Sequence, residues 1–501
     1  MRRIRLLAPA VLALLALPVA APHAQDAPPA PAAPAPEAPT SAGVELLTDL
    51  RAEYILGEAM LVRFTIDNTT SEPRSFADLS SRPWLVRFEL TYPNGKTQAW
   101  YTSPPEVDPN TRWSLVPRGQ RRVLLEIPSS ERLAAGDYSL VIKIQDDTRE
   151  IVLPAHSLRI APANPVGGEI VSEIGGVERS GHQVVWLHKA KEGYDLYLHH
   201  ADGKDPRRQL GDYQLLHLDT RVDPVLAQAR PQDRWDRHIY WATDSQSVAY
   251  VRLQGQGQGL AQDKPRVFRA PYPTVELIGR GSTDANGGLH VPMWVPAPKG
   301  AAGELRVASV RERVGPRFRQ VVRMDHRPDW VETVVDGSGN LRMLVAHDGN
   351  VDLYSLDSVT ELPAVGKRLL KAEEGATPWI GTFGYLPAKG ESSGGLAALI
   401  LSRTGDTVEG RWLSLEGMEL HRFPGQLVSP GMRPIDLLPR GYDGFGLLVG
   451  GEGGVLYLEP GEQPMGLGQQ ADAALVASKD GTRMLRRLVS GGPVEHKVLR
   501  P

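Results

Sequence analysis

The sequence predicts a mostly β protein in which a β-sandwich is followed by a β-propeller. Three observations predict this fold class. The 51 glycines and 42 prolines among 501 residues leave few uninterrupted segments long enough for a helix. Residues 43–162 alternate apolar and polar side chains, as half-buried strands do. Beyond residue 167, a short motif built around an aromatic strand recurs at intervals typical of propeller blades.

The first 24 residues have the composition of a secretory signal peptide. Three arginines within the first five residues precede an apolar run over residues 6–21, and Ala24 provides a small residue for cleavage. This run contains Pro9 and Pro18 and is shorter than the roughly 20 residues of a transmembrane helix. We therefore expect a cleaved export signal at 1–24 and no transmembrane segment in the mature chain.

Residues 25–42 form an Ala/Pro-rich segment. This composition cannot build a core and favours extended polyproline II geometry. Two interpretations stay open: a linker that sets the reach of the protein from a surface, or simply the tail that cleavage leaves.

Composition limits the compartment and the partners. The chain has no cysteine, which excludes disulfides and a lipid-modified N-terminal cysteine. Its net charge of -3 gives no overall attraction to nucleic acid or to an anionic membrane. We expect a periplasmic or secreted (cell-surface) protein that has no nucleic-acid partner and recognises charged partners through local patches.

Residues 43–162 are expected to form the sandwich. Val62, Phe64 and Ile66 alternate with polar residues, which predicts a strand with one buried face. Asn94-Gly95 predicts a hairpin with a type I′ turn, in which both central residues have positive φ. The phrases EYILGEAMLVRFTIDNTT (53–70) and LAAGDYSLVIKI (133–144) resemble the early and late strands of bacterial immunoglobulin-like modules. This resemblance implies an adhesion or spacer module.

The recurring motif is clearest at residues 193–210, GYDLYLHHADGKDPRRQL. Similar segments follow: GNVDLYSLDSVTELPAVGKRLL at 349–370, GRWLSLEGMELHRFPG at 410–425 and GVLYLEPGEQPMGLG at 454–468. The aligned aromatic residues Tyr197, Tyr354, Trp412 and Tyr457 are 157, 58 and 45 positions apart. The first interval corresponds to about three units, so the period is roughly 40 to 55 residues, the length of a four-stranded blade. Such a sheet buries its faces only against neighbouring sheets, so several blades must close into a ring.

Two other segments, YWATDSQSVAYVRLQ (240–254) and ALVASKDGTRMLRRLVSG (474–491), each suggest a strand, an Asp-centred turn and a second strand. We expect each of them to lie upstream of an aromatic strand like that of the motif. With Ser478-Lys-Asp-Gly-Thr-Arg483, the motif resembles the WD40-like repeat of TolB-type exported β-propellers.

The resemblance to TolB-type propellers implies a propeller over residues 167–501. The sequence departs from that family's pattern, because the turns at Asp244-Ser245 and Lys479-Asp-Gly481 lack the usual proline and residues 270–330 show no copy. Length favours seven blades, with six as the alternative. The expected architecture is thus an N-terminal immunoglobulin-like sandwich followed by a six- or seven-bladed β-propeller.

Three motifs contain residue types found in catalytic or metal sites. Gly390-Glu-Ser392-Ser-Gly394 matches the nucleophile elbow of α/β hydrolases, but a strand rather than a helix is expected after it, at 395–402. Asp336-Gly-Ser-Gly-Asn340 resembles the start of a calcium loop, with a tight hairpin turn as the preferred alternative. His199 and His200 are adjacent on a strand and point to opposite faces, which disfavours a shared metal. We therefore predict no catalytic, cofactor-binding or metal-binding residues and no cofactor.

The sharpest feature outside the scaffold is a cluster of seven arginines between residues 306 and 327, against Glu312 and Asp325. A turn at Gly315-Pro316 would place four of them on one face of a hairpin: Arg311, Arg313, Arg317 and Arg319. Two interpretations remain: a solvated strand face, or a docking site for an acidic protein or polymer.

These patterns favour a non-enzymatic, exported binding or scaffold protein of a cell-envelope assembly, with other envelope proteins as partners. The alternative is an extracytoplasmic propeller hydrolase or lyase whose site lies in the central funnel, where single residues from several blades meet. Two carboxylates, or a histidine and a carboxylate, converging in the funnel would favour this enzyme.

Overall fold

The computed structural model describes residues 40–500, with gaps at 42, 102–111, 147–148, 173–181, 202–208, 230–236, 254–264, 298–300, 312–313, 358–363, 372, 388–394, 443, 453, 469–472, 478–482 and 488–494. The predicted signal peptide and most of the predicted linker lie outside these residues. Within the described part, the secondary structure consists of strands and two short 3-10 helices, η1 (Pro83–Leu85) and η2 (Ser130–Arg132). No helix in this part is both long enough and apolar enough to cross a membrane.

Two antiparallel-rich sheets between residues 40 and 161 enclose one hydrophobic core. The first has the order β1 (Thr40–Ser41), β2 (Val44–Asp49), β4 (Leu61–Asn68) and β9 (Gln120–Glu126). The second has the order β3 (Glu53–Ile55), β12 (His156–Ala161), β10 (Gly136–Asp146), β6 (Val86–Thr91) and β7 (Thr97–Tyr101), with β11 (Arg149–Val152) on β10. A separate short pair joins β5 (Arg74–Ala77) to β8 (Arg112–Leu115).

The alternating pattern of β4 has the predicted effect. Val62, Phe64 and Ile66 are fully buried, whereas Arg63 between them is exposed. Because side chains alternate along a strand, one face of β4 faces the core and the other faces solvent.

The hairpin between β6 and β7 is present, but the predicted type I′ turn is wrong. Gly95 has a φ of 78°, and Asn94 is not among the residues with positive φ. Gly95 N donates to Tyr92 O at 2.9 Å, and Tyr92 N donates to Lys96 O at 2.8 Å. These bonds define a three-residue loop in which a type I turn is followed by a left-handed glycine. Of the predicted pair Asn94-Gly95, only Gly95 therefore has positive φ.

Residues 165–500 form seven successive sheets in the described part of the chain, and the strands of each run largely in sequence order. The strands are, sheet by sheet: β13 (Pro165–Ser172), β14 (His182–Lys189), β15 (Tyr194–Ala201), β16 (Gln209–Leu218); β17 (Val225–Leu226), β19 (Arg237–Ala242), β20 (Ser247–Leu253), β21 (Arg266–Arg269); β18 (Gln228–Ala229), β23 (Ser282–Thr283), β24 (Leu289–Val295), β25 (Gly303–Arg311), β26 (Val314–Met324), with β22 (Glu276–Leu277) on β24; β27 (Trp330–Val335), β28 (Leu341–His347), β29 (Asn350–Leu356), β30 (Val365–Leu370); β31 (Ala376–Leu386), β32 (Gly395–Thr404), β33 (Thr407–Ser414), β34 (Glu419–Arg422), with β35 (Gln426–Leu427) on β33; β36 (Arg433–Pro439), β37 (Phe445–Gly451), β38 (Gly454–Leu458), β39 (Met465–Gly468); and β40 (Ala473–Ala477), β41 (Arg483–Arg487), β42 (Glu495–Arg500).

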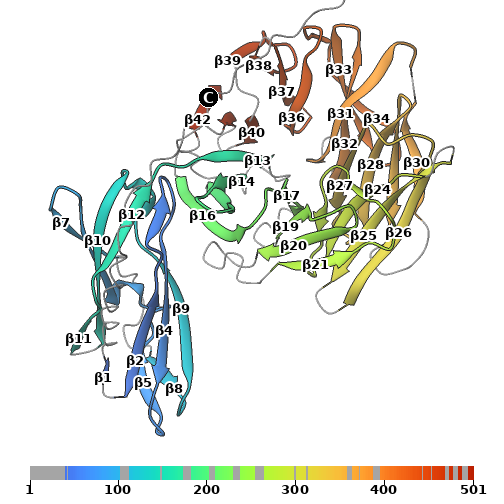
Figure 1. Cartoon of the computed structure of the whole chain (residues 1–501). Coiled ribbons are helices and arrows are strands. Elements are labelled where there is room, and N and C mark those ends of the chain that lie inside the picture. The colour runs from blue at the N-terminus through green and yellow to red at the C-terminus, as the bar shows by residue number, and fades with distance from the viewer. Residues whose placement is uncertain are drawn as a thin grey trace, which may run out of the picture. The chain divides into compact units, whose positions relative to one another are not determined.

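The seven sheets close into a ring. Contacts join β23 to β27, β27 to β31, β31 to β36 and β36 to β40, and β40 lies against β13, so the last sheet meets the first. Figure 1 shows the succession of sheets from β13 through β26 and β33 to β42 around this ring. Hydrophobic clusters fill the spaces between neighbouring sheets, as where Leu187 and Leu196 of the first pack with Ile239 and Val251 of the second. A closed ring of radially packed antiparallel sheets is a β-propeller.

All four copies of the sequence motif fall on the third strand of their sheets. The aligned aromatic residues Tyr197, Tyr354, Trp412 and Tyr457 lie on β15, β29, β33 and β38, and all are buried. The repeat in the sequence is therefore a repeat of sheet position. Tyr354, Trp412 and Tyr457 pack in clusters of the propeller sheets, whereas Tyr197 packs with Trp186 and Ile55.

The two strand-turn-strand segments do not occupy equivalent positions. Residues 240–254 span β19 and β20, so this segment already contains the third strand of its sheet and does not precede it. Residues 474–491 include β40 and β41, which begin a sheet. The strand that follows the second segment, β42, contains no Phe, Tyr or Trp. The expectation that each segment lies upstream of an aromatic strand like that of the motif is therefore wrong for both.

Candidate functional site

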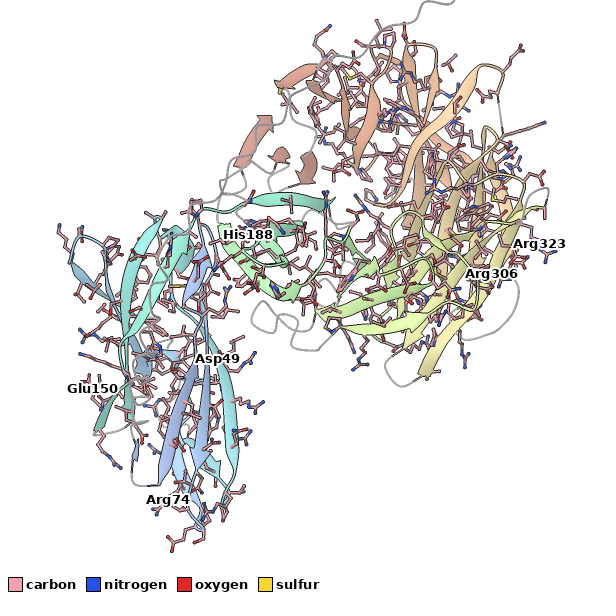
Figure 2. All side chains as sticks on the ribbon, viewed as in Figure 1. Asp49, Arg74, Glu150, His188, Arg306 and Arg323 are labelled. Carbon is pink, nitrogen blue, oxygen red and sulfur yellow. The ribbon has the colours of Figure 1, made fainter. Side chains whose placement is uncertain are left out.

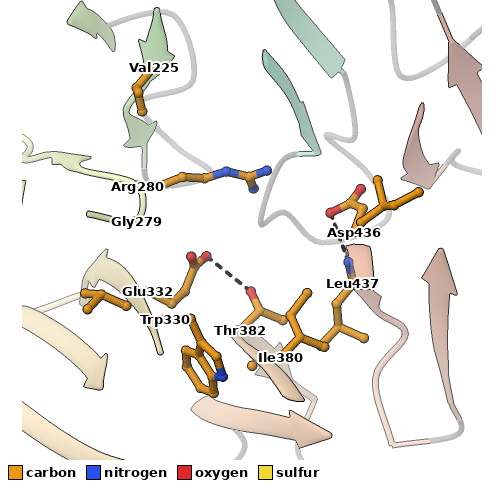
Figure 3. Close-up of a pocket in the computed structure, with 12 residues that line it drawn as sticks. Val225, Gly279, Arg280, Trp330, Glu332, Ile380, Thr382, Asp436 and Leu437 are labelled. Atoms are coloured by element: carbon orange, nitrogen blue, oxygen red, sulfur yellow. Dashed lines mark hydrogen bonds between the residues drawn. The ribbon is translucent and has the colours of Figure 1, made fainter. Parts of the chain in front are cut away.

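A pocket of about 320 Å³ lies where the first strands of several sheets meet, and we call it the funnel pocket. Its walls come from five segments that are distant in sequence (Figure 3). They are Val225 on β17, Gly279-Arg280 before β23, residues 330–332 on β27, residues 380–382 on β31 and residues 435–437 on β36. Three charged side chains line it: Arg280, Glu332 and Asp436.

Arg280 is presented by a tightly packed Gly-Arg-Gly segment. Gly279 has a φ of 64°, and a Cβ there would lie 2.0 Å from Val331 O. A Cβ on Gly281 would lie 2.5 Å from His290 O. Any larger residue at either position would push this segment away from β24 and β27. The two glycines therefore fix the backbone from which Arg280 extends into the pocket.

Glu332 accepts hydrogen bonds from two other segments. Gln228 Nε2 donates to Glu332 Oε1, and Thr382 Oγ1 donates to the same oxygen at 3.5 Å. The next residue, Thr333, donates through Oγ1 to Arg280 O at 2.7 Å. Because this bond joins β27 to the Arg280 segment, it fixes the two charged residues relative to each other.

Asp436 reaches the pocket at an irregularity in β36. The pairing of β36 with β37 shifts between Pro434 and Asp436, and Leu437 N donates to Asp436 Oδ1 at 2.9 Å. A similar shift in β31, between Pro378 and Ile380, precedes the wall formed by residues 380–382. Such bulges change the direction of side chains and are frequent next to binding sites. Figure 3 shows the Arg280 guanidinium and the carboxylates of Glu332 and Asp436 directed toward the same space.

Trp330 provides an apolar wall. A Cβ on Gly381 would lie 2.5 Å from Trp330 Cη2, so the glycine allows the indole to pack against β31. Ile380, Val331 and Leu437 add further apolar surface. The pocket thus combines charges of both signs with an apolar lining, which is typical of small-molecule sites.

The predicted partner-binding arginines lie on the outer strands of one sheet, but the predicted turn at Gly315-Pro316 is wrong. Both residues lie on β26, and the hairpin closes earlier, where Arg311 pairs with Val314. Arg317 and Arg319 are two residues apart on β26, so both point to the face opposite Phe318. Arg311 lies near the end of β25, with its Nη2 3.5 Å from Asp284 Oδ2. Arg313 lies outside the described residues. Arg311, Arg317 and Arg319 are called the arginine face below.

The positive side chains of the arginine face lie close enough to affect one another. The pKa of Arg319 is lowered, mainly by burial. The negative charge of Asp357 raises this pKa, whereas the nearby positive charges of Arg311 and Arg317 lower it. Arg319 also donates to Asp357 O. Elsewhere on this sheet, Arg306 and Arg323 both pair with Glu304, at 2.6 and 2.9 Å, and Figure 2 shows the two arginines near each other. The acidic neighbour neutralises much of their charge.

The other candidate motifs have structural surroundings. Ser392 lies outside the described residues, and β32 follows it, as expected from the sequence. Asp336 Oδ1 accepts bonds from Ser338 N and Asn340 N, both at 2.9 Å, and Arg342 Nε donates to its Oδ2 at 2.7 Å. These contacts form the hairpin turn between β27 and β28. His199 is buried on β15 with Nδ1 2.8 Å from Asp212 Oδ1, and the side chain of His200 is not described.

Sequence analysis missed a cluster with the composition of a catalytic triad. His290 Nδ1 lies 2.9 Å from Ser309 Oγ, and His290 Nε2 lies 3.2 Å from Asp284 Oδ2. His290 and Asp284 are buried, whereas Ser309 is partly exposed. A serine becomes nucleophilic when a neighbouring base such as histidine accepts its proton. The position of His290 next to Ser309 therefore makes a catalytic serine one interpretation of this cluster.

The next sheet repeats this cluster with an arginine in place of the histidine. Asp336 turns the first hairpin, Arg342 lies on the second strand, and Ser355 lies opposite Arg342 on the third and accepts from it. Ser309 lies opposite His290 in the same way. Because arginine cannot act as a base, the shared role of the two clusters is to tie three strands together.

The funnel residues were also missed, although a sequence signal for them exists. Several first strands begin near a proline that is followed four positions later by a polar residue: Pro165 and Glu169, Pro224 and Gln228, Pro328 and Glu332, Pro378 and Thr382. Proline is tolerated at the start of a strand because its missing N–H breaks no ladder bond there. This proline-polar pattern indicates funnel residues only when these segments are already known to be the first strands of their sheets.

Comparison with solved structures finds propeller proteins of low similarity. Prolyl oligopeptidase B from Galerina marginata matches with 11% identity and a TM-score of 0.38, over 80% of this chain and 55% of that chain. The WD40 domain of SCAP from fission yeast matches with 11% identity and a TM-score of 0.35, over 65% of this chain and 77% of that chain. No protein-family model and no curated protein sequence matches.

The chain spans about half the length of the prolyl oligopeptidase it matches. Because the TM-scores are low, the class of this protein is defined by its own sheet order and ring closure. It is a β-propeller protein with a second, two-sheeted β unit before the propeller.

Proposed function

We propose that this chain is an exported, non-enzymatic binding or scaffold protein of a cell-envelope assembly. In this proposal an immunoglobulin-like sandwich and a TolB-like propeller work in the periplasm or at the cell surface and bind other envelope proteins. The signal-peptide composition of residues 1–24 supports export. N-terminal sequencing of the fractionated protein tests this step: a mature chain starting near Gln25 is expected, and an intact Met1 in the membrane pellet would contradict it.

The observation that carries the binding role is the arginine face. Three guanidinium groups gather on the last two strands of one sheet, in a chain whose net charge is -3. An acidic protein or polymer that displaces water there would form charge-assisted, often bidentate hydrogen bonds of about 1.5–3 kcal/mol each. Electrostatic attraction would also raise the rate of association and make it depend on salt.

The test is a pull-down of envelope partners by the wild type and by a variant with Arg311, Arg313, Arg317 and Arg319 replaced by serine. The matched control replaces four exposed arginines of the N-terminal unit, Arg121, Arg122, Arg149 and Arg159, by serine. We expect the first variant to recover less partner and to show weaker salt dependence, whereas the control behaves as the wild type. Equal recovery by all three proteins at every salt concentration would refute the docking role.

A second candidate function, a funnel hydrolase or lyase, is favoured by one observation. Glu332 and Asp436 line the same pocket, and paired carboxylates can serve as general acid and base. Turnover of envelope polysaccharides or peptides by the wild type, and its loss in both Glu332→Gln and Asp436→Asn, would establish this function. Turnover that both variants retain would exclude the pocket as the active site.

A further inference from the structure

We propose that the funnel pocket binds a small zwitterion of the size of an α-amino acid. The carboxylate of the ligand would pair with Arg280, and its ammonium group would pair with Glu332 and Asp436. This inference is independent of the arginine face, which lies on β25 and β26 and contributes no residue to the pocket.

The two signs of charge in the pocket decide the class of ligand. A guanidinium presents two parallel N–H donors that match a carboxylate, whereas carboxylates only accept and therefore suit an ammonium group. A purely anionic ligand would be repelled by Glu332 and Asp436, and a purely cationic ligand by Arg280. A ligand with both charges is complementary to all three side chains.

The charged groups are held in place before a ligand arrives. Gly279 and Gly281 fix the backbone of Arg280, and Thr333 Oγ1 bonds to its carbonyl oxygen at 2.7 Å. Gln228, only 6% exposed, donates through Nε2 to Glu332. A site whose charged groups are already fixed loses little conformational entropy on binding.

The Gln228 amide lies next to Glu332 and is not among the described residues that line the pocket. Its orientation follows from Glu332, because a carboxylate accepts and must face the NH₂ group. Gln228 Oε1 is buried and has no hydrogen-bond partner among the described residues. The amide therefore acts through its NH₂ group, which holds the Glu332 carboxylate in position.

Size and apolar lining limit the ligand further. The pocket volume of about 320 Å³ is at the lower end of the usual range for small-molecule sites. Trp330 and Ile380 lie on the same walls as the charged groups and provide an apolar surface for the hydrocarbon part of the ligand. An α-amino acid combines these features, as does a short peptide such as a dipeptide, whose two ends carry the two charges.

Isothermal titration calorimetry on the mature chain tests the proposal. The probes are L-leucine, L-lysine and the dipeptide Gly-Leu, together with L-leucine methyl ester, which lacks the carboxylate, and N-acetyl-L-leucine, which lacks the ammonium group. We expect L-leucine or L-lysine to bind, and each leucine derivative to bind at least about tenfold more weakly than leucine, the loss expected when one charged contact is removed. Binding of Gly-Leu alone would assign the site to peptide ends. No binding by any zwitterion, or equal binding of leucine and its derivatives, would overturn the proposal.

Two variants assign the contacts. In Arg280→Gln, the preference for the acid over the methyl ester should disappear while the preference over the N-acetyl derivative remains. In Glu332→Gln, the preference over the N-acetyl derivative should fall instead. Arg132→Gln, at an exposed arginine of the N-terminal unit, serves as the control and should bind as the wild type. Unchanged selectivity in both funnel variants would overturn the assignment, and the derivative series on the wild type remains decisive if a variant fails to fold.

The outcome is separable from that of the docking test. The arginine-face variant should bind zwitterions as the wild type does, because none of its replaced residues lines the pocket. Loss of zwitterion binding in that variant would show that the two sites are coupled and would refute their independence.

Discussion

Replacing Asp284 with asparagine should destabilise the propeller by about 2 kcal/mol at neutral pH. Asp284 is 3% exposed and accepts bonds from Gly288 N and Asn286 N, both at 2.8 Å, and from His290 Nε2 at 3.2 Å. Burial opposes its ionisation, but the bonds from His290 and Gly288 outweigh burial and lower the pKa from 3.8 to about 2. A shift of nearly two units corresponds to about 2 kcal/mol at about 1.4 kcal/mol per unit.

The direction of the pKa shift of Asp284 determines how the destabilisation depends on pH. A carboxyl group whose pKa is lower in the folded state stabilises the fold above its unfolded pKa, and this contribution is lost as pH falls through the folded pKa. The difference between wild type and Asp284→Asn should therefore be full at pH 7 and about half as large near pH 3. Asparagine keeps the size of the side chain and one acceptor, so packing changes contribute little.

The assay is urea-induced unfolding followed by circular dichroism at both pH values. Asp336→Asn is the matched control, because Asp336 holds the equivalent turn with Arg342 in place of His290. We expect both variants to be destabilised at neutral pH. A cost for Asp284→Asn that is the same at pH 7 and pH 3 would refute the electrostatic origin and leave only a change in packing.

Three further predictions concern single residues. A fluorophosphonate probe should leave Ser309 unlabelled, because the equivalent cluster around Ser355 has no base; labelling that depends on His290 would contradict the structural role. Burial raises the pKa of Glu58 to about 7, so the wild type should lose stability as pH rises from 5 to 8 and Glu58→Gln should not; parallel pH profiles in thermal unfolding would exclude this assignment. Gly95→Ala should lower the free energy of unfolding by about 1 kcal/mol, measured by chemical denaturation. The cost comes from the φ of 78° alone, because no atom lies within 4 Å of the added Cβ. Gly315→Ala is the control and should be close to neutral, because Gly315 is equally open but lacks positive φ.

Strand patterns and the repeat could be predicted because they depend on neighbours in sequence. The alternation of Val62, Phe64 and Ile66 with polar residues produces one buried face in any sheet that pairs this strand. The four aligned aromatic residues fall on the third strand of their sheets because each sheet repeats the same order of strands. The Asn94-Gly95 turn was predicted with the wrong type, since loop length and Gly95 together favoured the three-residue hairpin.

The sequence by itself determined that this chain is mostly β and built from repeated, mutually packed sheets, because side-chain alternation and motif spacing are local properties. Only the tertiary structure decided which residues share a pocket. Arg280, Glu332 and Asp436 come from three sheets, and no pair of them is closer than 52 positions in the chain. Their meeting depends on ring closure, which brings the first strand of each sheet to the centre, and on the glycines and bulges that direct each side chain inward. The grouping of these three charged residues leaves no periodic pattern in the sequence, because each sheet contributes only one of them.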